Sequence, residues 1–145
     1  AEGLYKSNDR YSNLKTCSSL LYVLAAQQSK KNKWNDALIV NSNNTIIEST
    51  IANIFWVKDG RLYTPPLSDG CIAGVMRRHL ICESKHHHIP VIEAPLDLAS
   101  LFSADEVFLT NAIRRIKWVK EIGEKSYSSP SISRGIYDGL FRSWK

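Results

Sequence analysis

The chain has 145 residues, of which 43% are hydrophobic and 10% aromatic, and this composition predicts one folded domain and excludes a disordered segment. No apolar run approaches the ~20 residues that cross a membrane, so no membrane partner is expected. The net charge of +5 is spread over scattered basic residues, which is typical of a solvated surface and does not indicate nucleic acid binding.

The cysteine content and the first residues of the sequence indicate in which cellular compartment the protein is expected. Three cysteines at unrelated spacings argue against a disulfide framework. Residues 1–6 lack the charged and apolar regions of a secretory signal. We therefore expect a cytoplasmic protein.

The first third of the chain is expected to contain a tail, a helix and a hairpin. Residues 1–13 are polar, which is typical of a linker or of the remnant of an upstream domain. Apolar side chains then recur at helical spacing, so a helix with one buried face is predicted over residues 14–29. Residues 37–40 and 45–47 flank an Asn/Ser cluster and are predicted to pair as a hairpin.

A second hairpin and a second helix are expected in the middle of the chain. Residues 54–57 and 61–63 flank a short turn in which Gly60 supplies a positive φ. Two consecutive prolines, Pro65 and Pro66, stop the sheet pattern. Helical periodicity then resumes over residues 74–85.

The last third combines short strands with two helices. Strands are predicted over residues 90–93, 106–109 and 116–119, and a short helix over 96–102. An amphipathic helix closes the chain, with Ser129 as its cap, Pro130 at its first position, and apolar residues four apart at Ile132, Ile136, Leu140 and Trp144. Because strands outnumber helices and hairpins dominate, the fold class is α+β with a largely antiparallel sheet.

Four segments carry groups that could take part in chemistry. Lys15 lies at the N-terminal end of the first predicted helix, where a lysine is ordinarily solvated. Glu48 ends an apolar strand and opens the run Glu-Ser-Thr-Ile-Ala-Asn-Ile-Phe. Gly74 precedes the second predicted helix, and Thr110 with Asn111 ends a later strand. Each is a weak signal alone, since sheet margins often carry carboxylates and helix starts often carry glycine.

In this order, the segments resemble the cofactor-binding core of the class IV aminotransferases, the pyridoxal-phosphate enzymes of fold type IV. The resemblance runs from about residue 11 to the C-terminus and covers only the family's C-terminal domain, so residues 14–145 are expected to be a pyridoxal-phosphate-binding domain. The family's N-terminal domain, which supplies an arginine to the phosphate and much of the substrate pocket, is an expected partner. Family members usually form homodimers, and the same is expected here.

The resemblance implies a role for each segment. Lys15 would form a Schiff base with the cofactor aldehyde and then act as general acid and base. Glu48 would hold the ring nitrogen protonated. The backbone N–H groups of Val75 and Met76, made approachable by Gly74, would receive the phosphate at the positive end of the helix dipole.

Other residues near these motifs have smaller implied roles. Thr110 and Asn111 would donate to the phosphate, although a turn stabilised by its side chain is an equal alternative for Thr110. Arg77 either orients the loop before it or is solvated. Asn53 is interpreted as an anchor for backbone groups, and Phe55 as part of the core.

The resemblance leaves the reaction open between two activities on small amino-group substrates. The runs Glu-Ser-Thr-Ile-Ala-Asn, Ala-Gly-Val-Met-Arg and Thr-Asn-Ala-Ile look closer to 4-amino-4-deoxychorismate lyase, which releases pyruvate and makes 4-aminobenzoate for folate. A branched-chain or D-amino acid aminotransferase is the alternative. A non-catalytic scaffold or binding fragment without its N-terminal domain is the alternative from another class.

The histidines and cysteines indicate no further site. Three consecutive histidines, His86 to His88, cannot all face one ion on a regular element, and no neighbour has the spacing of a zinc site. We therefore predict an exposed loop there and no metal. None of the cysteines accompanies a histidine motif that would indicate thiol catalysis.

Overall fold

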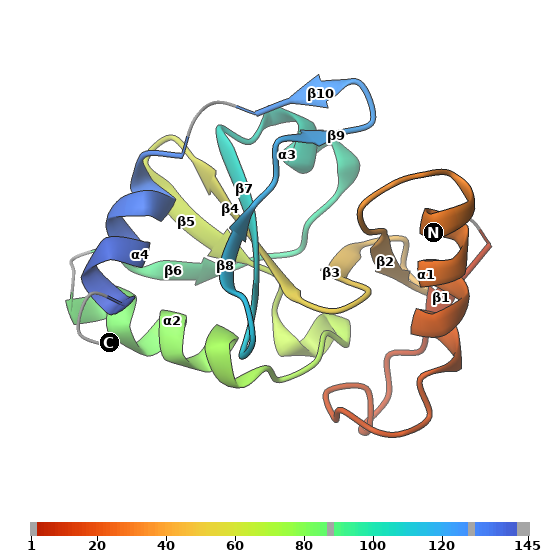
Figure 1. Ribbon diagram of the computed structural model, residues 1–145. Coiled ribbons are helices and arrows are strands. Elements are labelled where there is room, and N and C mark those ends of the chain that lie inside the picture. The colour runs from red at the N-terminus through yellow and green to blue at the C-terminus, as the bar shows by residue number, and fades with distance from the viewer. Residues whose placement is uncertain (1–2, 87–88, 128–129, 142–145) are drawn as a thin grey trace.

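The computed structural model describes residues 3–86, 89–127 and 130–141 of the chain. Its helical elements are α1 (Leu20–Lys31), the 3-10 turn η1 (Leu67–Asp69), α2 (Val75–His86), α3 (Leu98–Ser103) and α4 (Ile132–Phe141). Its strands are β1 (Tyr5–Lys6), β2 (Leu38–Asn41), β3 (Ile46–Ser49), β4 (Asn53–Lys58), β5 (Arg61–Thr64), β6 (Val91–Glu93), β7 (Glu106–Asn111), β8 (Arg115–Trp118), β9 (Glu121–Ile122) and β10 (Lys125–Ser126). Figure 1 shows their arrangement.

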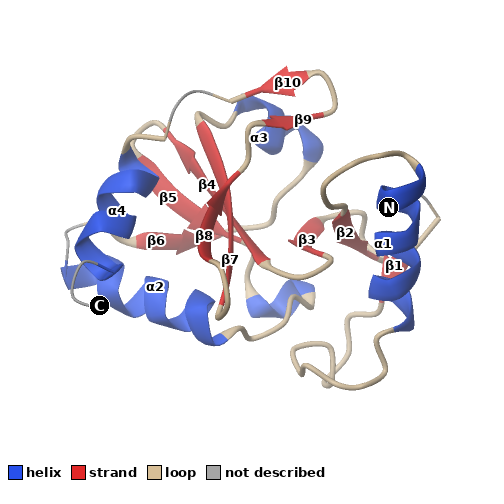
Figure 2. Ribbon diagram, viewed as in Figure 1, coloured by secondary structure: helices blue, strands red, loops and turns tan. Residues whose placement is uncertain are grey.

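An eight-stranded sheet organises the fold and branches at β4. Strand β4 pairs with β3, β5 and β7, and β7 pairs onward with β8. All these pairs are antiparallel, and parallel pairing occurs between β1 and β2 and between β5 and β6. Figure 2 shows helices on the outside of the strands. The predicted α+β class with a largely antiparallel sheet is confirmed.

The side chains of β4 alternate between two cores, because successive residues of a strand face opposite sides of the sheet. Phe55 and Val57 enter a cluster that α2 and α4 cover. Ile54 and Trp56 enter a second cluster, which contains Leu101 of α3. Phe55 lies opposite Phe108 on β7, and their rings stack with centroids 5.2 Å apart. The interpretation of Phe55 as a core residue is confirmed.

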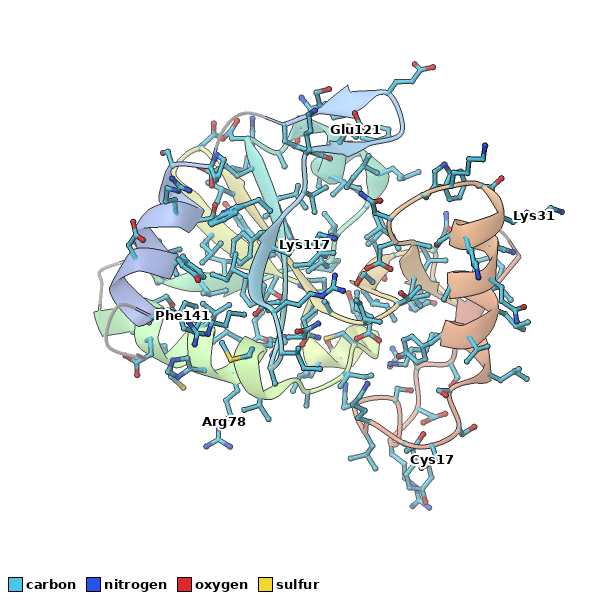
Figure 3. All side chains as sticks on the ribbon, in the orientation of Figure 1. Cys17, Lys31, Arg78, Lys117, Glu121 and Phe141 are labelled. Carbon is cyan, nitrogen blue, oxygen red and sulfur yellow. The ribbon has the colours of Figure 1, made fainter. Side chains whose placement is uncertain are left out.

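A third, smaller core attaches α1 to β2 and β3, beside the main body in Figure 1. Ala25 of α1 packs there with Ile39, Ile47 and Cys71, all of them almost fully buried. The opposite face of α1 is apolar but exposed, with 68% of Leu20 and 47% of Val23 accessible to solvent. Figure 3 shows Lys31 and Cys17 pointing away from the protein at the edges of this region.

Both predicted hairpins are confirmed, as β2–β3 and as β4–β5. The second one turns through Asp59 and Gly60, whose φ angles are +48° and +74°, as the glycine predicted. The helix predicted over residues 74–85 is α2, the one over 96–102 is α3, and the three later strands are β6, β7 and β8.

The N-terminal part of the chain differs from the prediction in two ways. The first helix begins at Leu20 and not at residue 14, because residues 11–19 are held in turns, such as that closed by Leu14 N–H on the Tyr11 carbonyl. Leu14 is 57% exposed, so its apolar spacing did not reflect a buried helix face. Residues 5 and 6, expected to belong to a linker, form β1 and pair with β2.

The last helix also begins later than predicted, at Ile132, so Pro130 precedes it and is not its first residue. Ser129 and Trp144 lie outside the described residues. The helix is capped from β7 instead: the Glu106 carboxylate accepts backbone N–H groups from Ser131, Ile132 and Ser133 at 2.8–3.0 Å. The cap could not be read locally because it comes from 25 residues earlier in the chain.

None of the helices within the described ranges is long and apolar enough to cross a bilayer.

Candidate cofactor site

Glu48 is a buried carboxylate at the centre of the candidate site, with 2% of its surface exposed. Strand β3 holds it between Ile39 of β2 and Asn53 of β4. Its Oε1 atom accepts hydrogen bonds from the Lys6 ammonium at 2.8 Å and from the Tyr22 hydroxyl at 2.6 Å. Its Oε2 atom accepts the backbone N–H of Ile72 at 3.0 Å. A buried carboxylate is thus compensated by an ion pair and two further donors.

Lys6 and Tyr22 reach Glu48 from two separate elements. The parallel pairing of β1 with β2 sets Lys6 opposite Asn41, and helix α1 carries Tyr22. The Lys6 ammonium also lies 5.4 Å from the centroid of the Tyr22 ring, a cation–π contact. Burial, and then the charge of Glu48, raises the pKa of Tyr22, so the phenol stays protonated and donates.

Asparagine side chains hold the loop of residues 67–73 in place below Glu48. Asn13 donates to the Leu67 and Cys71 carbonyls at 2.8 and 2.7 Å, and Asn41 donates to the Asp69 carbonyl at 2.9 Å. Asn53 donates to the Ile72 carbonyl at 2.8 Å, so its interpretation as a backbone anchor is confirmed. Because Ile72 also donates to Glu48, these bonds fix the loop relative to the carboxylate.

Gly74 lies where this loop enters α2, and its missing side chain is required there. A Cβ atom on Gly74 would come within 2.1 Å of the Asn53 side-chain oxygen. Val75 and Met76 follow as the first residues of α2, whose leading N–H groups have no partner inside the helix.

Arg77 orients the loop before it and is not solvated. Its guanidinium is buried and donates to the Pro65 carbonyl at 2.8 Å and to Glu93 at 2.6 Å.

A cavity of about 760 Å³ opens beside Glu48. Lys15 lines it, together with the three partners of the Glu48 carboxylate, Lys6, Tyr22 and Ile72. Lys15 is exposed and sits in the irregular segment before α1, two residues after the anchoring Asn13. Lys15 and the hydrogen-bond partners of Glu48, which lies 33 residues further along the chain, therefore line one cavity.

The other candidate residues are not among the described residues that line this cavity. Gly74, Val75 and Met76 follow Ile72 along the chain and are not among the lining residues. The Thr110 hydroxyl donates to the Arg115 carbonyl at 2.7 Å, which is the turn arrangement left open for it. Asn111 donates to the Ile51 carbonyl at 3.2 Å and lines a small hollow next to Ile51. Ile51 lines both spaces, so Asn111 is one residue removed from the cavity.

Three residues of this site were missed by sequence reasoning: Lys6, Tyr22 and Asn13. Lys6 lay in a segment interpreted as a tail, and its two-residue strand is too short to produce a periodic pattern. Tyr22 lay inside the first predicted helix and was not singled out. Asn13 had no signal except its place two residues before Lys15.

Among the described residues, no cysteine or histidine side chain binds Glu48 or lines the cavity. Burial raises the pKa of Cys71 to about 11, and its thiol lies 3.7 Å from the Pro65 carbonyl, so it remains a protonated core side chain. Across the described ranges, no group of three or more His, Cys, Asp or Glu residues could hold a metal ion. An exposed loop was expected for all three consecutive histidines, but His86 is the last residue of α2, and His87 and His88 fall outside those ranges.

Comparison with known proteins identifies the family. A family model described as amino-transferase class IV matches residues 4–122. Aminodeoxychorismate lyase of Vibrio harveyi is 38% identical over 91 residues, which are 63% of this chain and 34% of that protein. The chain thus spans about a third of that relative's length.

Solved structures agree in fold over nearly the whole chain. The crystal structure of 4-amino-4-deoxychorismate lyase from Pseudomonas aeruginosa matches 97% of this chain and 53% of its own, with a TM-score of 0.90 and 26% identity. That of the Escherichia coli branched-chain amino acid aminotransferase matches 100% of this chain and 50% of its own, with a TM-score of 0.91 and 25% identity. The chain therefore belongs to the class IV aminotransferase family.

Proposed function

We propose that this chain is the cofactor-binding part of a pyridoxal-phosphate enzyme. The observation that carries the proposal is the buried Glu48 carboxylate behind a cavity on whose wall Lys15 stands. The site also fits the cofactor chemically. Glu48 Oε2 has one partner, so it can accept one more donor, which a protonated ring nitrogen supplies.

Each side chain has a defined task in this proposal. Bound pyridoxal phosphate supplies an electron sink for a carbon of the amino substrate. The Lys15 amine holds the cofactor aldehyde and moves a proton at that carbon. Glu48 accepts a hydrogen bond from the ring nitrogen and keeps it protonated.

The phosphate is assigned to the beginning of α2. The N–H groups of Val75 and Met76 donate to it there, where the helix dipole is positive. Gly74 has no side chain to collide with Asn53, so the backbone can lie close to that residue at the start of α2. Asn111 is proposed to border the phosphate from the end of β7, and Thr110 beside it, whose hydroxyl is bound to the Arg115 carbonyl, is proposed to border it without donating its hydroxyl proton.

For the reaction, we propose 4-amino-4-deoxychorismate lyase activity, which forms 4-aminobenzoate and pyruvate. The Glu48 run and the Thr110-Asn111-Ala112-Ile113 turn support it, and so does the likeness to the Vibrio lyase. A branched-chain or D-amino acid aminotransferase is the second candidate, supported by the likeness to the Escherichia coli enzyme. A scaffold that binds without catalysis is the candidate outside the enzymes.

We also propose that these residues work with an N-terminal domain and as a homodimer. The chain covers 50–53% of the two solved structures above, which leaves room for a further domain. The exposed apolar face of α1, with Leu20, Val23 and Leu24, is the surface that such a partner would bury.

The decisive experiment labels the cofactor lysine in the full-length protein. Pyridoxal phosphate is added, and the absorption is recorded at wavelengths where the protein itself does not absorb. Borohydride then makes the attachment permanent, and the labelled peptide is identified by mass spectrometry. We expect a visible band and a label on Lys15, and neither in Lys15→Ala. Lys30→Ala, on the exposed end of α1, is the matched control and should label normally.

Two substrates then separate the candidate reactions. Release of pyruvate from 4-amino-4-deoxychorismate supports the lyase, whereas amino transfer from leucine to 2-oxoglutarate supports the aminotransferase. Binding and labelling without either turnover would indicate the scaffold. A label on a lysine other than Lys15 would show that the assignment of the site is wrong.

A further inference from the structure

The two oxygens of Glu48 are used unequally. Each carboxylate oxygen can accept two hydrogen bonds. Oε1 has both, from Lys6 and Tyr22, whereas Oε2 has one, from Ile72. Within the described part of the chain, one acceptor position on Oε2 is therefore left.

The donors to Oε1 also set the direction of that open position. The last torsion of a glutamate side chain has a broad energy profile, so the carboxylate plane is oriented by its partners and not by the side chain itself. Lys6 comes from β1, Tyr22 from α1 and Ile72 from the loop after η1, so three elements hold the plane. Figure 1 shows β1 and α1 next to β2 and β3.

Charge and burial make this arrangement specific to Lys6 and Tyr22. The side chains of Lys6 and Glu48 are 11% and 3% exposed, and a buried carboxylate without its cation would be strongly destabilised. The Lys6 ammonium contacts the Tyr22 ring as well, so the two donors support each other. Both also line the cavity, so the donors that hold Oε1 lie at the wall that an occupant would contact.

We propose that Lys6 and Tyr22 form a clamp that turns the open acceptor position of Glu48 Oε2 toward the ring N–H of the cofactor. They are positioning residues, because they act through Glu48 and their own polar groups are occupied by it. The proposal rests on the proposed function, since the ring nitrogen is that of pyridoxal phosphate.

The test compares two ligands that differ only at the ring nitrogen. Pyridoxal phosphate and an analogue with C–H in place of that nitrogen are titrated into the full-length cofactor-free protein, and both dissociation constants are measured by tryptophan fluorescence. We expect the unaltered protein to prefer pyridoxal phosphate about tenfold to a hundredfold, the range for one charge-assisted hydrogen bond.

Loss of the clamp should remove this preference. In Tyr22→Phe and Lys6→Met we expect the ratio of the two constants to fall to within about threefold, whereas Lys6→Arg, which keeps a cationic donor, should retain most of it. A purely structural role would weaken both ligands equally and leave the ratio unchanged. Tyr127→Phe is the matched control, because it removes one tyrosine hydrogen bond, 3.1 Å to the Leu101 carbonyl, away from the cavity.

The outcomes separate the clamp from the cofactor assignment. If the unaltered protein binds neither ligand, both the assignment and the clamp are overturned. If it prefers pyridoxal phosphate and the Lys6 and Tyr22 variants keep the full preference, the clamp alone is overturned. A preference lost equally in Tyr127→Phe would also overturn it, because the effect would then not depend on Glu48.

Discussion

Replacing Gly74 by alanine should destabilise the loop beneath the candidate site. The added Cβ atom would lie 2.1 Å from Asn53 Oδ1, closer than atoms tolerate, and 3.3 Å from its Cγ. The Asn53 side chain must therefore rotate, and its hydrogen bond to the Ile72 carbonyl is lost. Ile72 in turn holds Glu48, so the effect should extend to the carboxylate.

The size of the effect follows from these contacts. Leaving a buried amide and carbonyl unpaired costs roughly 1–3 kcal/mol, and relieving the overlap costs about the same. A Gly→Ala change also lowers the conformational entropy of the unfolded chain, which raises the free energy of unfolding by about 0.4–1 kcal/mol. We expect a net loss of about 2–3 kcal/mol, which at an m-value of ~2–3 kcal/mol/M lowers the urea midpoint by about 1 M.

Urea unfolding of the full-length protein, followed by tryptophan fluorescence, measures this loss. Gly135→Ala is the matched control: it lies in α4 with nothing within 4 Å of its added Cβ, so it should be stabilised by about 0.5–1 kcal/mol. In an Asn53→Ala background, Gly74→Ala should cost nothing further. Equal midpoints for the two glycine variants, or additive losses with Asn53→Ala, would refute the steric argument.

Two further predictions concern the elements that support the site. Burial alone would raise the pKa of Glu106, but hydrogen bonds from the Ser133 hydroxyl and from backbone N–H groups hold the pKa below its usual 4.5. The stability that this cap of α4 contributes is then present above pH ~4.5 and is lost as the pH falls through the folded-state pKa of Glu106. Glu106→Gln should therefore lower the free energy of unfolding by about 1–2 kcal/mol at pH 7 and by less at pH 3. Equal losses at both pH values in urea unfolding would contradict this. Phe108→Ala removes a fully buried ring that stacks on Phe55 and should cost about 3–5 kcal/mol in the same assay, whereas Ile113→Ala, 91% exposed, should cost less than about 0.5 kcal/mol.

Local chemistry explains why much of the fold could be predicted. The Asp59-Gly60 turn selects a hairpin through backbone conformation alone, and the alternation of Phe55 and Val57 with Ile54 and Trp56 depends only on the period of a strand. The order of the motif residues Lys15 and Glu48 along the chain is also a property of the sequence alone, and it carried the resemblance to the family.

Tertiary contacts decided the rest. The spacing of Leu14 with later apolar residues predicted a helix, but Asn13 binds the loop of residues 67–73 and holds this segment out of the helix. The partners of Glu48 come from positions 42, 26 and 24 residues away, and the cap of α4 from 25 residues away. The sequence by itself determined the hairpins and the family, and it predicted Lys15 and Glu48 as residues of the candidate site. Only the folded chain determined which donors orient the buried carboxylate, because hydrogen bonds between distant segments leave no local pattern.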